Sequence, residues 1–269
     1  MKPELEAKYE KLKNNLSLRG SAAVAFSGGV DSSLLLYAAK EALGERAVAV
    51  TVISPFFPGR EKQQAQDFCS EYGIRQIELE FNPLADAAIS RNPPDRCYIC
   101  KKKLFGFILE KAEEEGIKTV IDGTNADDVS DYRPGMRALE ELGIISPLKE
   151  CGITKKDVYS LSAELNLPTK DKPSLACLAT RIPYGETLTA EKLKMAEQGE
   201  SILYGLGFSR LRVRVHGDTA RIELDPGDFT LIENEELRKE IYAKFREAGF
   251  SYTALDLLGY RTGSMNETL

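Results

Sequence analysis

Apolar residues in the first half of the chain form two alternating patterns, short runs and helical repeats. The short runs are mostly apolar, as expected of strands buried on both faces of a parallel sheet. They cover residues 22–26, 47–53, 75–79 and 118–122. The segments between them have helical patterns that end at glycines. They cover residues 32–43, 62–72 and 101–115, and an amphipathic segment at 3–18 precedes them all. The alternation predicts an α/β fold, a parallel sheet sandwiched by helices.

The pattern changes near residue 168. Residues 168–185 carry three prolines and are typical of a loop or hinge. Beyond them, residues 189–206 have a helical pattern. Residues 211–216, 220–224 and 252–258 are typical of strands, and Asp228 is a candidate cap for a helix. We therefore expect an α/β domain over 1–167, the hinge over 168–185 and a smaller α+β unit over 186–269.

Composition is that of an ordinary globular protein. The 269 residues are 42% hydrophobic and 29% charged, with a net charge of −6. The acidic balance argues against wrapping nucleic acid over a wide basic surface. No apolar run has the ~20 residues that cross a membrane, and the first six residues lack an apolar signal-peptide core. We expect a cytoplasmic protein without a membrane or nucleic-acid partner.

Cysteine and histidine counts restrict the chemistry. The chain has one histidine, which excludes a mechanism resting on several. It has five cysteines, and an odd number in a cytoplasmic chain argues against a disulfide framework and for metal or sulfur chemistry. The cysteines are Cys69, Cys97, Cys100, Cys151 and Cys177.

The segment 27–33 lies between the first strand and the next helix. Its glycines let the backbone approach an anion, and free N–H groups at a helix N-terminus bind one. An aspartate there would repel phosphate unless a magnesium ion were present. The alternative is a capped strand-to-helix turn, which the whole string makes improbable. The string is Ser27, Gly28, Gly29, Val30, Asp31, Ser32 and Ser33.

A second polar segment, 122–128, follows the fourth strand. Ligands bind at the carboxyl ends of parallel strands, so this loop and the first are expected to meet. Asp and Asn are often only turn formers, but two such loops together favour a nucleotide site. The first string contains no Walker A motif. It resembles the PP-loop of the ATP-pyrophosphatases, whose fold is that of the adenine nucleotide alpha hydrolases and whose members activate a carbonyl or carboxylate oxygen as an adenylate.

Further segments narrow the resemblance: residues 96–101, 131–138, 173–186, 211–214 and 259–264. With the PP-loop, they make nearly the whole chain similar to the LarE family. The resemblance implies ATP-dependent sulfur transfer to the carboxylates of pyridinium-3,5-biscarboxylic acid mononucleotide, in synthesis of the nickel-pincer nucleotide of lactate racemase. It implies magnesium and a homo-oligomer, with hexamers known in the family. The implied ATP site comprises residues 27–33, Val52, Gly123, Thr124 and Asn125, with Asp31 and Asp128 on magnesium.

The resemblance makes Cys177 the sulfur-bearing residue, with Arg181 and Asp31 as catalytic partners. In the family's simplest members this cysteine gives up its own sulfur in one turnover. Here Cys97 and Cys100 add a Cys-x-x-Cys, and the likeness to relatives with three such cysteines implies a [4Fe-4S] cluster with one open iron. A redox pair, part of a zinc site and incidental thiols remain alternatives for the pair, and sacrificial use of Cys177 remains an alternative to the cluster.

The substrate end is expected on the strands after residue 211. Alternation sends Arg212 and Arg214 to one face, and arginines on adjacent strands favour a phosphate or carboxylate site. A solvated basic face is the alternative. The resemblance adds further substrate positions. The full expected set is Arg212, Arg214, Arg133, Arg261, Glu200 and Glu223.

Three other functions are alternatives to ATP-dependent sulfur transfer. A tRNA thiolation enzyme uses the same activation, but the pI near 5.2 and the lack of a basic RNA-binding extension oppose it. An amidotransferase such as NAD synthetase leaves the cysteines unexplained. A non-enzymatic nucleotide sensor would bind ATP without releasing pyrophosphate in response to a substrate.

Overall fold

The computed structural model describes residues 2–130, 134–172, 177–261 and 263–267. Their contacts divide the chain into two units. The first consists of Met1–Ser54, Gly59–Phe81 and Cys97–Leu175. The second consists of Pro55–Pro58, Asn82–Arg96 and Ala176–Leu269. Two short stretches from the first hundred residues therefore pack with the C-terminal part of the chain.

The first unit is built on a four-stranded sheet with the order β3-β2-β1-β4, all parallel. Its strands are β1 (Ala22–Ala25), β2 (Ala47–Ile53), β3 (Arg75–Glu80) and β4 (Val120–Ile121). All four strands that the apolar runs predict are present. β1 and β2 are almost wholly buried, which explains why their sequences are apolar at successive positions rather than at alternate ones.

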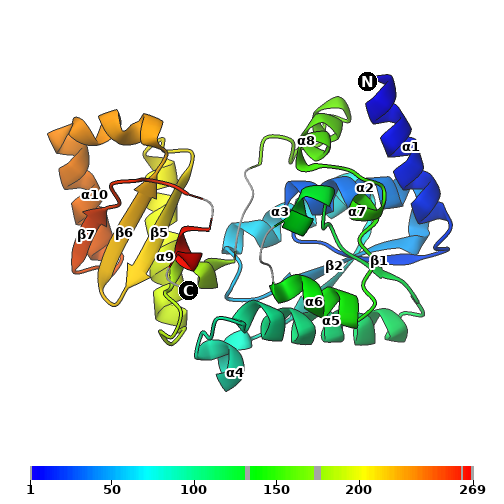
Figure 1. The fold of residues 1–269 in the computed structure, drawn as a ribbon, viewed down its shortest axis with the longest axis horizontal. Coiled ribbons are helices and arrows are strands. Elements are labelled where there is room, and N and C mark those ends of the chain that lie inside the picture. The colour runs from blue at the N-terminus through cyan, green and yellow to red at the C-terminus, as the bar shows by residue number, and fades with distance from the viewer. Residues whose placement is uncertain (1, 131–133, 173–176, 262, 268–269) are drawn as a thin grey trace. The chain divides into compact units, whose positions relative to one another are not determined.

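Helices cover both faces of this sheet (Figure 1). On one face lie α1 (Pro3–Ser17), α2 (Val30–Leu43), α3 (Gly59–Glu71), α7 (Pro147–Glu150) and α8 (Lys155–Glu164), and on the other α5 (Arg96–Glu114) and α6 (Pro134–Glu141). Short 3₁₀ helices η1 (Gly44–Arg46) and η3 (Ala126–Ser130) complete the unit.

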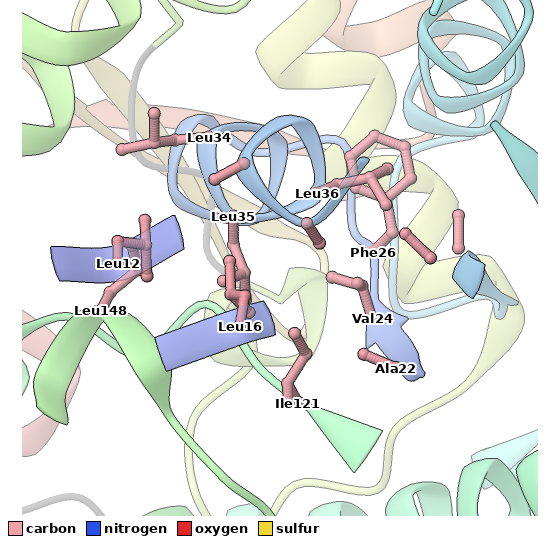
Figure 2. Packing of buried hydrophobic residues seen from close by; sticks show 14 of the residues in the cluster. Leu12, Leu16, Ala22, Val24, Phe26, Leu34, Leu35, Leu36, Ile121 and Leu148 are labelled. Atoms are coloured by element: carbon pink, nitrogen blue, oxygen red, sulfur yellow. The ribbon is translucent and has the colours of Figure 1, made fainter. Parts of the chain in front are cut away.

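Residues of β1 point alternately into the two cores. Ala22 and Val24 pack with Leu16 of α1 and Leu35 of α2 in the larger core, which Figure 2 shows from close by. Ala23 packs on the other face against Phe105 and neighbouring residues of α5. Because β1 is buried from both sides, the loop at its carboxyl end starts from a fixed position.

The second unit has a three-stranded sheet with the order β5-β6-β7. β5 (Leu211–His216) and β6 (Thr219–Leu224) are antiparallel, and β7 (Tyr252–Leu255) runs parallel to β6. Its helices are α4 (Ala87–Ser90), α9 (Ala190–Gly205), α10 (Glu235–Glu247) and the 3₁₀ helices η2 (Pro83–Ala85), η4 (Leu178–Arg181), η5 (Pro226–Glu233) and η6 (Ser264–Asn266). The expected α/β class with a smaller α+β unit is confirmed.

Two boundaries differ from the sequence expectation. The cap of α10 is Asn234, whose side chain accepts a hydrogen bond from the N–H of Leu237, and not Asp228, which lies in η5. Helix α5 begins at Arg96 rather than at residue 101, so the Cys-x-x-Cys lies within its first two turns. None of the helices in the described ranges combines the length and apolar composition that crossing a membrane requires.

Candidate functional site

The PP-loop runs from the end of β1 into the first turn of α2. Gly28 has φ +71°, a left-handed conformation that glycine adopts without steric cost. Gly29 is the N-cap of α2 and supplies no side-chain cap for the first N–H groups of the helix. Its own N–H donates to the Ser27 hydroxyl at 3.4 Å. The Ser32 hydroxyl accepts from the N–H of Ser27 at 3.3 Å and donates to the carbonyl of Gly29 at 3.1 Å. The loop is thus folded on itself by its own serine.

The carboxylate of Asp31 receives two donors from separate parts of the first unit. Nδ2 of Asn125, from the loop after β4, donates to Oδ1 at 3.0 Å. Nζ of Lys155, the first residue of α8, donates to Oδ2. Two of the expected ATP-site residues, Asp31 and Asn125, are therefore brought together from positions 94 apart in sequence. Lys155 is an addition that the sequence interpretation missed.

The loop after β4 approaches the start of α2 very closely. A Cβ on Gly123 would lie 3.0 Å from the backbone N of Ser32, so only glycine fits there without displacement. The buried carboxylate of Asp122 accepts from the hydroxyls of Thr124 and Ser146. Oδ2 of Asp128 accepts from the N–H of Asn125 at 3.0 Å. In this structure Asp128 therefore holds the Asn125 loop in shape.

Val52 lies near the carboxyl end of β2 and is half-buried. That position is on the strand next to β1, at the same sheet edge as the PP-loop. Another residue missed by the sequence interpretation, Lys172, donates to the carbonyl of Gly28 at 2.9 Å. The PP-loop is thus contacted by two lysines from the later part of the first unit, and no local sequence spacing marks either.

The cysteines fall into two groups by burial. Cys69 and Cys151 are buried, and burial raises the pKa of Cys69 to about 12 and also raises that of Cys151. Cys97, Cys100 and Cys177 are half-buried. Cys97 and Cys100 are three residues apart on α5, so they lie on neighbouring positions of the helix surface.

Cys177 directly precedes η4, in the second unit. Its carbonyl accepts from the N–H and the hydroxyl of Thr180, at 3.0 and 2.7 Å. The guanidinium of Arg181 is 1% exposed and makes a bidentate pair with Glu200, at 2.7 and 3.1 Å. It also reaches the Cys177 carbonyl at 3.4 Å. Arg181 therefore ties the turn that carries Cys177 to α9.

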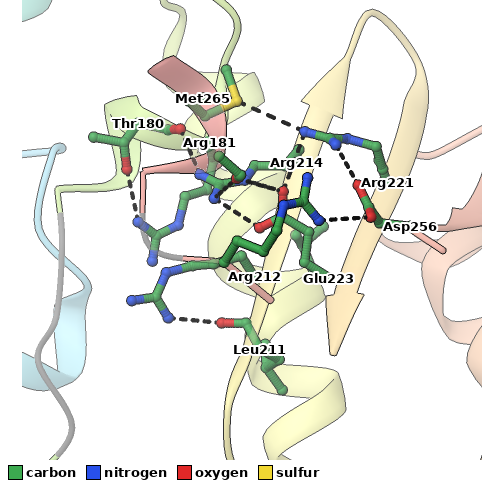
Figure 3. Close-up of polar contacts among 12 residues, drawn as sticks. Thr180, Arg181, Leu211, Arg212, Arg214, Arg221, Glu223, Asp256 and Met265 are labelled. Carbon is green, nitrogen blue, oxygen red and sulfur yellow. Dashed lines mark hydrogen bonds and ion pairs between the residues drawn. The ribbon is translucent and has the colours of Figure 1, made fainter. Parts of the chain in front are cut away.

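A buried ionic network connects β5, β6 and the C-terminal segment (Figure 3). Arg214 makes a bidentate pair with Glu223, at 3.0 and 2.8 Å, and also donates to Ser264. Arg221 bridges Glu223 and Asp256, and Arg261 donates to the other oxygen of Asp256 at 3.1 Å. Arg212 and Arg214, expected together on one face of β5, are both buried, which contradicts the alternative of a solvated basic face. For Arg214 the Glu223 carboxylate compensates the buried charge.

Arg212 differs from its neighbours in what surrounds it. Its side chain donates to the carbonyl of Leu211 at 2.7 Å and lies 5.1 Å from the ring centre of Tyr260. It is only 7% exposed. Burial and the positive charge of Arg181 lower the pKa of Arg212 below its usual value. A bound anion would relieve both effects, so Arg212 is suited to receive one.

Some of the expected site residues cannot be placed in the site as the structure describes it. Arg133 and residues 173–176 are outside the described residues. Within the described ranges, no three His, Cys, Asp or Glu side chains are grouped so that they could hold a metal ion. Among the residues that are described, the expected ATP-site residues lie in the first unit. The expected arginine and glutamate residues lie in the second unit.

Comparisons with known proteins identify relatives of this chain. Residues 4–103, which include the PP-loop, match the NAD synthase family model. An uncharacterised protein of Synechocystis is 40% identical over 98% of this chain and 99% of its own length. An uncharacterised protein of Methanocaldococcus jannaschii is 33% identical over 95% of this chain and 98% of its own length.

A third relative carries a functional name. It is the pyridinium-3,5-bisthiocarboxylic acid mononucleotide synthase of Lactiplantibacillus plantarum, 38% identical over 91% of this chain and 89% of its own. That likeness extends across both units and confirms the resemblance seen in the motifs. The chain belongs to the LarE family, an ATP-using family of PP-loop sulfurtransferases that includes this synthase.

Proposed function

We propose that this protein uses ATP to activate the carboxylates of pyridinium-3,5-biscarboxylic acid mononucleotide and converts them to thiocarboxylates for the nickel-pincer nucleotide. The observation that carries the proposal is the meeting of Asp31 and Asn125 at the PP-loop, at the carboxyl end of β1. The family relative named for the bisthiocarboxylic acid product supports the choice of substrate.

The ATP site in this proposal is formed by residues 27–33, Val52, Gly123, Thr124 and Asn125. The backbone N–H groups at the start of α2 bind phosphate oxygens, and Gly123 lets the β4 loop close over that turn. Asp31 is the carboxylate best placed to hold magnesium, with Asp128 as a second candidate. A bound magnesium ion would neutralise phosphate charge. Asn125 and Lys155 keep the Asp31 carboxylate oriented.

The proposed reaction has two steps. A substrate carboxylate oxygen attacks the α-phosphorus of ATP, the bond to the bridging oxygen breaks, and pyrophosphate leaves. The positive end of α2 stabilises the charge that develops on the phosphates. A sulfur nucleophile then attacks the acyl carbon, and AMP leaves with the oxygen that the carboxylate contributed. Activation is required because a free carboxylate oxygen is a very poor leaving group.

The second unit would bind the substrate's anionic groups. We propose Arg212 as the principal cation, because it is buried beside Arg181 and its pKa is lowered by both burial and that charge. Arg214 and Arg181, which pair with Glu223 and Glu200, would shape the site around it. Arg261 and Arg133 complete the proposed substrate set.

Cys177 is the proposed origin of the sulfur. The support is the family likeness of its segment and its half-buried position beside η4. We further propose that Cys97 and Cys100 join it in holding a [4Fe-4S] cluster. The adjacency of the pair on α5 supports this, although the described residues contain no three-ligand group. When bound, such a cluster would supply a transferable sulfide. Sacrificial donation of the Cys177 sulfur is the competing route.

Two measurements separate these routes. Anaerobic reconstitution with iron and sulfide should give a broad visible absorption band that Cys97→Ala lacks. If Cys97→Ala retains the band, the ligand assignment is wrong. Intact mass after turnover should be unchanged if a cluster delivers the sulfur. If each molecule instead loses the mass of one hydrogen sulfide, the sacrificial route holds.

The test of the function itself is pyrophosphate release. We expect release with ATP and the pyridinium dicarboxylate mononucleotide, and negligible release with ATP alone. Release that responds only to tRNA would support the tRNA thiolation alternative and contradict the proposal. Binding of ATP without release under any of these conditions would support a nucleotide sensor.

We also propose a cytoplasmic homo-oligomer, with a hexamer as one possible assembly. Exposed apolar residues of the second unit support association. Tyr252, Leu257 and Leu258 are 66%, 87% and 68% exposed, and apolar groups of this size at a protein surface favour burial against a partner. Light scattering of the purified protein would give the mass of the assembly, and a monomer would contradict this part.

A further inference from the structure

The side chain of Lys172 joins the PP-loop to helix α3 within the first unit. Nζ donates to the carbonyl oxygen of Gly28 at 2.9 Å and to Oε2 of Glu61 at 2.6 Å. The side chains of Lys172 and Glu61 are 13% and 10% exposed. A contact this sheltered from water is stronger and less screened by salt than a surface ion pair. Nothing in the proposed adenylation or sulfur-transfer steps uses either residue.

The Gly28 carbonyl is a sensitive point in the loop. Peptide groups are planar, and none of the described residues has a cis bond, so the carbonyl of Gly28 and the N–H of Gly29 point in opposite directions. Gly28 has φ +71°, and glycine at such a position can rotate into several other backbone conformations. A donor that holds the Gly28 oxygen therefore fixes the direction of the Gly29 N–H, at the N-cap of α2.

Glu61 in turn depends on Lys172. The whole Glu61 residue is 8% exposed, and within the described structure its Oε1 has no hydrogen-bond partner. The nearest other cation is Arg60, whose Nε is 3.8 Å from Oε1. The backbone of α3 is also close to the loop, since a Cβ on Gly28 would lie 3.6 Å from the Glu61 carbonyl. Removing the ammonium would thus leave a buried carboxylate beside the phosphate loop.

We propose that Lys172 is a positioning residue for ATP activation. With Glu61 it fixes the Gly28–Gly29 peptide and so the direction of the Gly29 N–H. In this structure that N–H makes a long hydrogen bond, 3.4 Å, to the Ser27 hydroxyl, which a phosphate oxygen of ATP would replace. The charge of Lys172 also offsets Glu61, which would otherwise repel the phosphates. The inference rests on the proposed use of this loop for ATP, and it assigns to Lys172 no contact with the reacting atoms.

Binding of an ATP analogue tests the inference directly. In this analogue a methylene group replaces the oxygen between the α- and β-phosphates, so pyrophosphate cannot leave. Its Kd would be measured by calorimetry for the wild type, Lys172→Met, Lys172→Arg and Glu61→Gln. Lys170→Met is the matched control, because Lys170 lies two residues earlier and its Nζ donates to Asn166 on the surface.

We expect Lys172→Met to weaken binding of the analogue at least about tenfold. The free energy of a hydrogen bond from a charged group typically corresponds to a tenfold or larger change in Kd. Lys172→Arg should restore most of the affinity, and Glu61→Gln should weaken it less than Lys172→Met does. Lys170→Met should match the wild type. A role in folding alone would lower the unfolding temperature without changing the Kd of the folded protein, so both quantities are measured for each variant.

Two results would overturn the inference. One is a folded Lys172→Met protein that binds the analogue as the wild type does. If Lys172→Met does not fold, wild-type affinity in Glu61→Gln would overturn it instead. Failure of the wild type to bind the analogue at all is a different result, because it would contradict the proposed function of the PP-loop itself.

Discussion

At the scale of single residues, the arginines of β5 show what alternation can and cannot predict. The pattern places Arg212 and Arg214 on one face of a strand, and both side chains do belong to one polar cluster. It does not show that Arg214 is neutralised by Glu223, at 3.0 and 2.8 Å, whereas Arg212 lies beside the like charge of Arg181. The difference arises from partners on β6 and η4, so it could not be predicted from the strand alone.

Cysteine reactivity gives a prediction at the same scale. In native protein free of iron, at pH 8, iodoacetamide should modify Cys97, Cys100 and Cys177 and leave Cys69 and Cys151 unmodified. Burial holds the pKa of Cys69 near 12, so its reactive thiolate is on the order of one part in ten thousand at that pH. Raising the pH to 9 would leave Cys69 almost entirely protonated.

Peptide mapping by mass spectrometry would measure the modification at each cysteine. Protein unfolded in denaturant, in which all five thiols react, is the control. Labelling of native Cys69 at the rate of Cys97 would contradict the burial on which the division into two groups of thiols rests.

At the scale of elements, the apolar runs were sufficient to predict the strands of the central sheet. All four strands of the first unit were predicted, because a strand buried on both faces needs an apolar residue at nearly every position. The order β3-β2-β1-β4 could not be obtained in this way, since it depends on how the helices cross over. The loops that bind ligands were nevertheless located, because they follow the strands directly.

The sequence interpretation missed the helices between residues 123 and 167. Helix α8 begins with a capping box, in which Thr154 accepts from the N–H of Asp157 and the Asp157 carboxylate accepts from the N–H of Thr154. That signal is present in the sequence as a threonine followed three residues later by an acid. Recognising it would have placed Lys155 at the start of a helix, but not beside Asp31.

At the scale of the whole molecule, the division of the chain is not contiguous. The buried residues Asn92 and Arg96 fasten the segment Asn82–Arg96 to the second unit. The Asn92 amide donates to the carbonyls of Ile182 and Pro183, at 3.2 and 2.7 Å, and Arg96 donates to that of Ala179 at 3.1 Å. These contacts join positions 83 to 91 apart in sequence, and no local pattern indicates them.

The two units also divide the proposed chemistry. The first contains the PP-loop with Asp31 and the residues that orient it, and the second contains Cys177 and the arginine network. Family membership could be inferred from the sequence, because its characteristic motifs are distributed along nearly the whole chain. The identity of the sulfur donor could not be inferred, because Cys97 and Cys177 belong to different units and no local sequence pattern tells whether they act together.

The most direct test of the central claim is mass spectrometry of the mononucleotide after incubation with the protein, ATP and magnesium. The wild type should replace a carboxylate oxygen of the pyridinium dicarboxylate with sulfur. Cys177→Ala should form no thiocarboxylate. Asp31→Asn should form it at least about a hundredfold more slowly, since it removes the carboxylate proposed to hold magnesium, and with that ion the neutralisation of phosphate charge. An unchanged carboxylate despite ATP cleavage by the wild type, or equal sulfur transfer by Cys177→Ala, would contradict the account.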